Sequence, residues 1–140
     1  MKALGLLGLL VLFASASSAE EARRIPIEQR FLVASLNGMD FGNRTLTLTV
    51  GRDPRGGGLR GRGFAGCNTW FGRVSIGEGD RFSVEQIGTT RKYCTAARMR
   101  LEQDFLAALR SVTRWRMEGS TLILAGEKST LHLVPVTRRA

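Results

Sequence analysis

The alternation of hydrophobic and polar residues predicts a series of short β-strands with one helix in the last third of the chain. Residues 45–50 are the clearest strand, because threonines alternate strictly with aliphatic residues, which therefore share one face. Before them, the mostly apolar run 31–36 ends at Asn37-Gly38, a pair that favours a tight turn. The pattern thus begins as two strands in succession.

Further strands are predicted on both sides of the helix. Residues 70–76 and 81–87 predict a hairpin around the glycine-containing turn at 77–80. After the helix, three strands of a meander are predicted at residues 114–117, 121–125 and 129–135.

The helix is predicted from a change of hydrophobic period after residue 94. Thr95 is placed as an N-cap, and Leu101, Phe105 and Leu109 recur on one face. We expect this amphipathic helix to cover the open side of a curved antiparallel sheet or small β-barrel-like fold, a mainly β (α+β) class. A helix lying on a membrane surface is the alternative, but its polar face carries acids as well as bases.

Residues 51–63 combine one proline, several glycines and four arginines. We expect a mobile connection between strands, because glycine and proline interrupt regular structure. Arg-Gly-rich segments also track single-stranded nucleic acid, but one such patch is weak support for that function. Trp70 and Phe71, which follow, are predicted to be core residues, with the wall of a ligand pocket as the alternative.

The first residues have the pattern of a secretory signal peptide. Lys2 precedes an uncharged apolar run, and the small residues Ser17 and Ala19 predict cleavage after Ala19, which removes residues 1–19. The apolar run is shorter than the ~20 residues that span a bilayer, so an uncleaved anchor is only the alternative. We expect a soluble, periplasmic or secreted mature chain without a transmembrane segment, beginning with a flexible leader at residues 20–29.

The two cysteines, Cys67 and Cys94, are interpreted in the light of that predicted export. Disulfides persist outside the cytosol, so we predict an intramolecular bridge, with free thiols as the alternative. A metal or redox site is not supported, because the cysteines are far apart and His132 is the one histidine. No cofactor is predicted.

The chain has a net charge of +9, and nearly all of its 21 basic residues are arginine. This charge suits anionic partners, but the arginines are scattered along the chain, which favours an ordinary basic surface. The sequence contains no nucleophile elbow, phosphate-binding loop or metal-ligand cluster. We therefore predict no enzymatic activity.

Three segments together resemble the META domain, the family of HslJ-like bacterial envelope proteins. They are Gly66-Cys67-Asn68-Thr69-Trp70-Phe71-Gly72, Thr90-Arg91-Lys92-Tyr93-Cys94, and Glu102, Phe105, Leu106 and Leu109 of the helix. The resemblance covers about residues 30–136 and leaves residues 137–140 as a tail. It implies a compact β-barrel-like fold with one helix, found in exported or outer-membrane-associated proteins, and it supports the Cys67–Cys94 bridge.

The motif residues are interpreted as structural. Asn68 is expected to hold a tight turn through hydrogen bonds to the nearby backbone. Arg91 is expected to reach Glu102 or a main-chain carbonyl and so to lock the loop before the helix. Gly66, Gly72 and Thr90 complete the motif, and no catalytic residue follows from the resemblance.

Relatives have been linked to heat shock, novobiocin resistance and virulence, which implies a stress-related protein that binds an envelope protein, lipid or lipopolysaccharide. Nucleic acid is not expected as the partner of an exported protein. A carrier with an apolar ligand inside the barrel is one alternative, and it requires a cavity that Trp70, Phe82 and Trp115 do not fill. The other is a basic protein that binds lipopolysaccharide or another anionic polymer, which requires a clustered arginine face.

Overall fold

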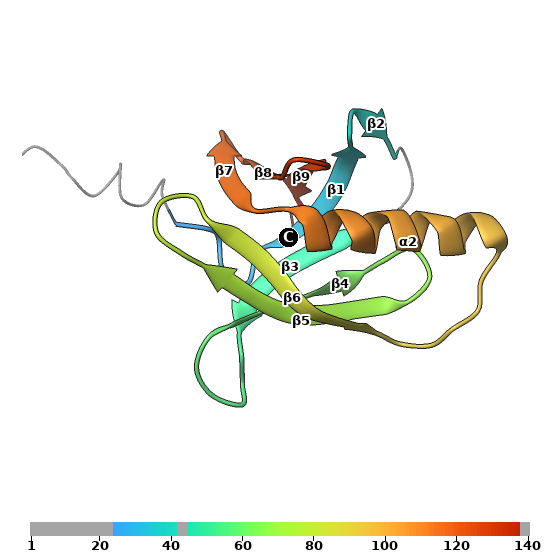
Figure 1. Ribbon diagram of the computed structural model, residues 1–140, viewed down its shortest axis with the longest axis horizontal. Coiled ribbons are helices and arrows are strands. Elements are labelled where there is room, and N and C mark those ends of the chain that lie inside the picture. The colour runs from blue at the N-terminus through green and yellow to red at the C-terminus, as the bar shows by residue number, and fades with distance from the viewer. Residues whose placement is uncertain (1–23, 42–44, 138–140) are drawn as a thin grey trace, which may run out of the picture.

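The computed structural model describes residues 24–41 and 45–137, and within them the chain forms one curved sheet and one helix (Figure 1). The predicted signal peptide and its cleavage site lie outside the described residues. The helix, α2, spans Ala96–Ser111. The strands are β1 (Arg30–Leu36), β2 (Met39–Asp40), β3 (Thr47–Arg52), β4 (Leu59–Phe64), β5 (Thr69–Ile76), β6 (Phe82–Thr89), β7 (Arg114–Glu118), β8 (Thr121–Ala125) and β9 (Thr130–Pro135).

All strand pairs are antiparallel, in the order β6-β5-β4-β3-β1-β9-β8-β7, with β2 paired to β1. The sheet curls into a half-barrel whose two edge strands meet at one end. There the Phe82 backbone N–H donates to the Thr113 carbonyl and the Trp115 N–H donates to the Asp80 carbonyl, each at 2.9 Å. The predicted mainly β fold is confirmed.

The helix α2 covers the open side of this half-barrel. Figure 1 shows it crossing in front of the sheet, with β5 and β6 below it and β1, β8 and β9 above it. Thr95 caps the helix, since its Oγ1 accepts from the Arg98 backbone N–H at 3.3 Å. The predicted apolar face, including Leu101, Phe105 and Leu109, is buried against the sheet.

The space between helix and sheet is filled by aromatic and aliphatic side chains. Trp70 and Phe105 meet edge to face with their ring centroids 6.3 Å apart. Phe31, Phe82 and Trp115 are buried in the same cluster. A ligand inside the half-barrel would therefore have to displace the residues that hold the fold together.

Residues 59–64 form the central strand β4, so the prediction of a mobile connection over 51–63 is wrong for this part. β4 pairs with β3 on one side and β5 on the other. A Cβ at Gly61 would lie 2.8 Å from the Trp70 ring, and one at Gly63 would overlap the Thr47 carbonyl oxygen. The glycines leave room for the indole, and their lack of side chains hides the strand from a hydrophobicity pattern.

Two other predictions need correction. The leader predicted to be flexible at residues 20–29 is attached to the sheet at two points: the Ile25 side chain is only 6% exposed, and the Glu28 N–H donates to the Val50 carbonyl at 2.7 Å. Residues 20–23 lie outside the described part. Phe71 is not a core residue beside Trp70, because successive strand residues face opposite sides of a sheet.

Candidate functional site

The motif residues meet where α2 begins, around the buried side chain of Asn68. Its backbone N–H and its Nδ2 both donate to the Glu102 carboxylate, at 2.6 and 2.9 Å. Its Oδ1 accepts from the Lys92 backbone N–H at 2.6 Å and from the Thr90 hydroxyl at 3.0 Å. One amide thus joins the turn after β4, the loop after β6 and the helix.

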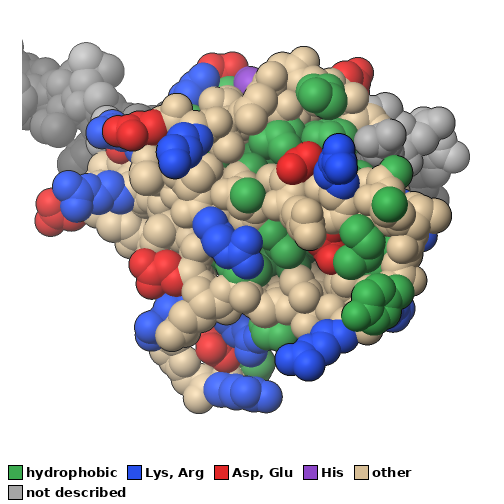
Figure 2. Space-filling model, turned by 45° about the vertical axis from the view of Figure 1, so that its right-hand side comes forward, with side chains coloured by type: hydrophobic (Ala, Val, Ile, Leu, Met, Phe, Trp, Pro, Cys, Tyr) green, Lys and Arg blue, Asp and Glu red, His purple; other side chains and the backbone are tan. Residues whose placement is uncertain are grey.

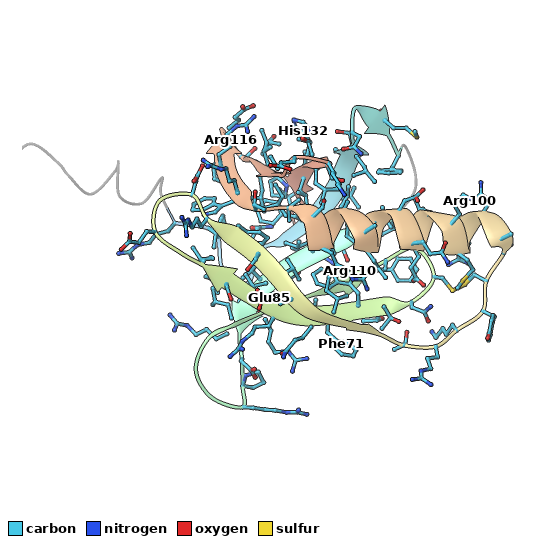
Figure 3. All side chains as sticks on the ribbon, in the orientation of Figure 1. Phe71, Glu85, Arg100, Arg110, Arg116 and His132 are labelled. Atoms are coloured by element: carbon cyan, nitrogen blue, oxygen red, sulfur yellow. A yellow bond between two sulfur atoms is a disulfide. The ribbon has the colours of Figure 1, made fainter. Side chains whose placement is uncertain are left out.

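The predicted disulfide is present beside this amide and links Cys67 to Cys94 with their Cα atoms 6.0 Å apart. The yellow bond in Figure 3 lies near the start of α2. Arg98 adds a third connection, because its Nε donates to the Gly66 carbonyl at 2.9 Å. Gly66 has a φ of +112°, a conformation that glycine adopts without a Cβ penalty.

Arg91 does not have the predicted role. It is exposed, and Glu102 is bonded to Asn68 instead, because the carboxylate faces inward beneath the helix. Gly72 lies in β5 opposite an irregularity in β6, where a Cβ would come within 3.1 Å of the Glu85 carbonyl oxygen. The motif is therefore a set of packing and hydrogen-bonding positions.

This buried network has a structural role in the described residues. The Glu102 side chain is 5% exposed and both of its oxygens accept hydrogen bonds.

Among residues 24–41 and 45–137, no group of three or more His, Cys, Asp or Glu is placed to hold a metal ion. In the same part of the chain, no helix is long and apolar enough to cross a membrane.

The second candidate region is on the outer face of the sheet. A surface groove, called the outer groove below, lies over β4 to β6; its lining residues are Asp53, Arg60, Phe71, Gly72, Arg73 and Gln86. The strand register places Arg60 opposite Arg73 and Arg62 opposite Phe71. Three arginines and one aromatic ring therefore occupy adjacent positions on this face.

Phe71 is held in place on this surface. A Cβ at Gly88, its partner in β6, would lie 2.5 Å from the Phe71 ring, so the ring rests against the glycine backbone. The Arg60 guanidinium carbon is 5.9 Å from the ring centroid, within the range of a cation–π contact. The side chain nevertheless remains 39% exposed.

One of the three arginines has an acidic partner. Arg62 donates to Glu28 at 2.8 Å, and this hydrogen bond holds the pKa of Glu28 below its ordinary value of 4.5. The ion pairs formed among the described residues do not include Arg60 or Arg73. Figure 2 shows basic side chains at several separate places on the surface that it presents.

The sequence-based prediction missed the outer groove for a specific reason. Arg60 and Arg73 are distant in the sequence and become neighbours only when β4 is recognised as a strand. The alternation Leu59-Arg60-Gly61-Arg62-Gly63-Phe64 is a usable signal, because it puts both arginines on the same face of a strand. A binder of anionic polymers requires a clustered arginine face. The folded chain brings arginines together in this way, although they are separated in the linear sequence.

The META domain family matches residues 25–137 of the chain. The chain belongs to the META domain family. The matched range starts at Ile25, the first buried residue described, and confirms the family resemblance. Among curated proteins, none matches this META domain protein.

Solved structures share the fold of this META domain protein at low sequence identity. An NMR structure of a protein from Burkholderia xenovorans has a TM-score of 0.65 and 21% identity, covering 80% of this chain and 84% of that one. A second NMR structure has a TM-score of 0.58 and 19% identity, covering 82% and 92%. The crystal structure of a DUF4847 family protein from Bacteroides vulgatus has a TM-score of 0.55 and 14% identity, covering 83% and 96%. These likenesses concern the fold alone.

Proposed function

We propose that this META domain protein is an exported, non-enzymatic envelope protein that binds an anionic envelope component through the outer face of β4 and β5. The observation that carries the proposal is the register pair Arg60 and Arg73, two cations directly opposite each other that form no ion pair within the described part of the chain. Like charges in that position are destabilising across a sheet. A bound anion would offset this repulsion.

The filled interior supports an external binding surface over an internal one. Trp70, Phe82 and Trp115 are at most 6% exposed and belong to one cluster. A carrier of an apolar ligand needs that space to be free. The carrier alternative therefore has less support than binding at the outer face.

The test measures binding of the purified mature chain to vesicles that contain lipopolysaccharide, with neutral phosphatidylcholine vesicles as reference. We expect binding to the anionic vesicles that falls steeply between low and high salt, because exposed charges are screened. Replacing Arg60, Arg62 and Arg73 together by alanine is expected to weaken binding by about tenfold or more.

A matched control removes the same charge from elsewhere on the molecule. The control variant replaces Arg100 and Arg110 of α2 and Arg116 of β7 by alanine (Figure 3). None of these three residues lines the outer groove. Arg116 also has an acidic partner, Glu118 at 3.1 Å, as Arg62 has Glu28. Equal losses in the two triple variants, or equal binding to neutral vesicles, would contradict the proposal.

Export and a role in stress are further parts of the proposal, supported by the pattern of residues 1–19 and by what is linked to the family. Fractionation of cells that produce the full chain is expected to place it outside the cytosol, cut after Ala19. An Ala19→Arg variant is expected to keep the signal segment uncut. Recovery of the intact chain in the cytosol would contradict export.

A further inference from the structure

The outer groove combines an aromatic ring that rests on Gly88, an amide, a carboxylate and two guanidinium groups that form no ion pair among the residues the structure describes. Resting on the proposed function, we propose that it is a subsite for a phosphorylated sugar unit, with Arg60 and Arg73 binding the phosphate and Phe71 packing against the sugar ring. Asp53 and Gln86, whose side chains end in a carboxylate and an amide, line the same groove. They supply the acceptors and donors that sugar hydroxyls need.

The spacing of the groove suits a ligand of that size. Side chains directly opposite each other across two strands are about 5 Å apart at Cβ. Residues two apart along a strand, such as Phe71 and Arg73, are separated by about 7 Å. Arg60, Arg62, Phe71 and Arg73 therefore outline an area that holds one pyranose ring with its phosphate.

The two arginines are suited to bind phosphate. Guanidinium groups present paired N–H donors that match phosphate oxygens, and Arg60 and Arg73 are directly opposite each other in the strand register. Arg60 is partly buried and in contact with Phe71, so its position is already restricted before a ligand arrives. Glu85, in β6, is the register partner of Arg73 on the other side. Its negative charge confines the positive potential to the area around Arg60 and Arg73.

The exposed Phe71 ring is the reason for proposing a sugar unit in the ligand. The face of a phenyl ring is slightly negative and packs favourably against the C–H groups of a pyranose. Gly88 lets the Phe71 ring lie against the strand while 39% of the side chain remains exposed. An anion without an apolar face, such as inorganic phosphate, would make no contact with the exposed part of this ring.

The carboxylate of Asp53 argues against a continuous polyanion. One Asp53 oxygen accepts from the Arg55 backbone N–H at 3.0 Å, which fixes the side chain at the groove. A nucleic acid strand that placed one phosphate on the arginines would bring neighbouring phosphates toward this negative charge. A sugar carrying a single phosphate at the arginines avoids that repulsion.

The test titrates the purified mature chain with a glucosamine disaccharide that carries phosphate, followed by NMR chemical shifts or calorimetry. The comparison probes are the same disaccharide without phosphate, inorganic phosphate, phosphatidylglycerol vesicles and oligothymidylate. We expect the phosphorylated disaccharide to bind at least about tenfold more tightly than inorganic phosphate or the unphosphorylated sugar. Use of soluble and vesicle probes separates a sugar phosphate from a lipid headgroup.

Three variants separate the contributions. Arg73→Ala is expected to weaken binding by about tenfold, and Arg73→Lys by less, because lysine keeps the charge and loses the paired donors. Phe71→Ala is expected to weaken binding of the sugar phosphate by about fivefold and binding of inorganic phosphate by clearly less, because inorganic phosphate loses only the contact that restricts Arg60. Arg100→Ala, on α2, is expected to change nothing, and thermal melting checks that each variant is folded.

The outcomes are distinguishable. If phosphatidylglycerol vesicles bind as tightly as the disaccharide and Phe71→Ala has no effect, the sugar subsite is wrong while anion binding at the outer face stands. If oligothymidylate binds more tightly than the disaccharide, the groove recognises nucleic acid and the inference is overturned. If no anionic probe binds, both this inference and the proposed function are overturned.

Discussion

The backbone and side chain of Asn68 are hydrogen-bonded to several neighbouring groups in the interior. Its side chain and N–H satisfy the buried Glu102 carboxylate, and its Oδ1 accepts from the Lys92 N–H and the Thr90 hydroxyl. Its own carbonyl accepts from the Ala65 N–H at 2.8 Å. Loss of the side chain would leave buried polar groups without partners, which costs more than the bonds themselves contribute.

Asn68→Ala is therefore expected to lower the free energy of unfolding by about 2–4 kcal/mol, as a buried hydrogen-bonded group of this kind does. Urea denaturation of the oxidised protein measures it. Arg91→Ala, an exposed neighbour in the same motif, is the control and should stay within about 0.5 kcal/mol. Similar values for both variants would mean that the network does not stabilise the fold.

Glu28 gives a second prediction at this scale. The hydrogen bond from Arg62 lowers the pKa of Glu28 in the folded protein, so its contribution to stability is complete above the ordinary value of 4.5 and is lost as the pH falls through the lower, folded pKa. In Arg62→Ala the pKa of Glu28, measured by NMR titration, should rise toward 4.5. Arg114→Ala removes the ion-pair partner of Asp80 instead, and it should leave the pKa of Glu28 as low as in the natural protein.

At the scale of the elements, the position of β4 in the sheet depends on the glycines at 61 and 63, which have no side chain. Gly63 faces the interior next to Trp70, whose Nε1 donates to the Thr47 carbonyl at 3.0 Å. Thr47 also accepts from the Phe64 N–H through its hydroxyl at 2.8 Å. The close approach of β3, β4 and the indole requires a glycine here.

Gly63→Ala should accordingly lower the free energy of unfolding by about 3 kcal/mol or more, because the added methyl overlaps backbone that cannot move independently. Trp fluorescence should shift to the red as the indole loses its buried hydrogen bond. Gly57→Asn, at a turn position with open space and a positive φ, is the control and should fold normally. A normal Gly63→Ala protein would show that the strands can separate here.

The same elements explain how far the sequence could be used. The strand at 45–50 and the helix after Thr95 were predictable because their hydrophobic period is regular, and Leu46, Leu48 and Leu109 are all fully buried. β4 was not, because two of its three interior positions, Gly61 and Gly63, are glycines and only Leu59 is apolar. The buried bonds of Asn68 to Glu102 and the opposition of Arg60 and Arg73 depend on register and on the helix docking, which no local pattern specifies.

For the molecule as a whole, the disulfide connects the turn before β5 to the loop before α2. The two cysteines are 27 positions apart, and the enclosed chain includes the whole β5–β6 hairpin. In the chain-entropy description, such a crosslink stabilises by limiting the freedom of the unfolded chain.

Replacing Cys67 and Cys94 together by serine should lower the free energy of unfolding by about 3–4 kcal/mol. Urea denaturation with and without reductant measures the effect: reductant should destabilise the natural protein and leave the double variant unchanged. The Asn68 network, which is retained, is expected to keep the variant folded. Identical midpoints for the oxidised and reduced natural protein would contradict the prediction.

Arg60, Phe71 and Arg73 of the outer groove are strand residues outside the buried core cluster. The side chains that would contact a ligand can therefore be replaced without repacking the interior. Laboratory selection that randomises Arg60, Phe71 and Arg73 should yield variants with new ligand preferences and parental melting temperatures, which makes this frame a usable scaffold for engineered binders.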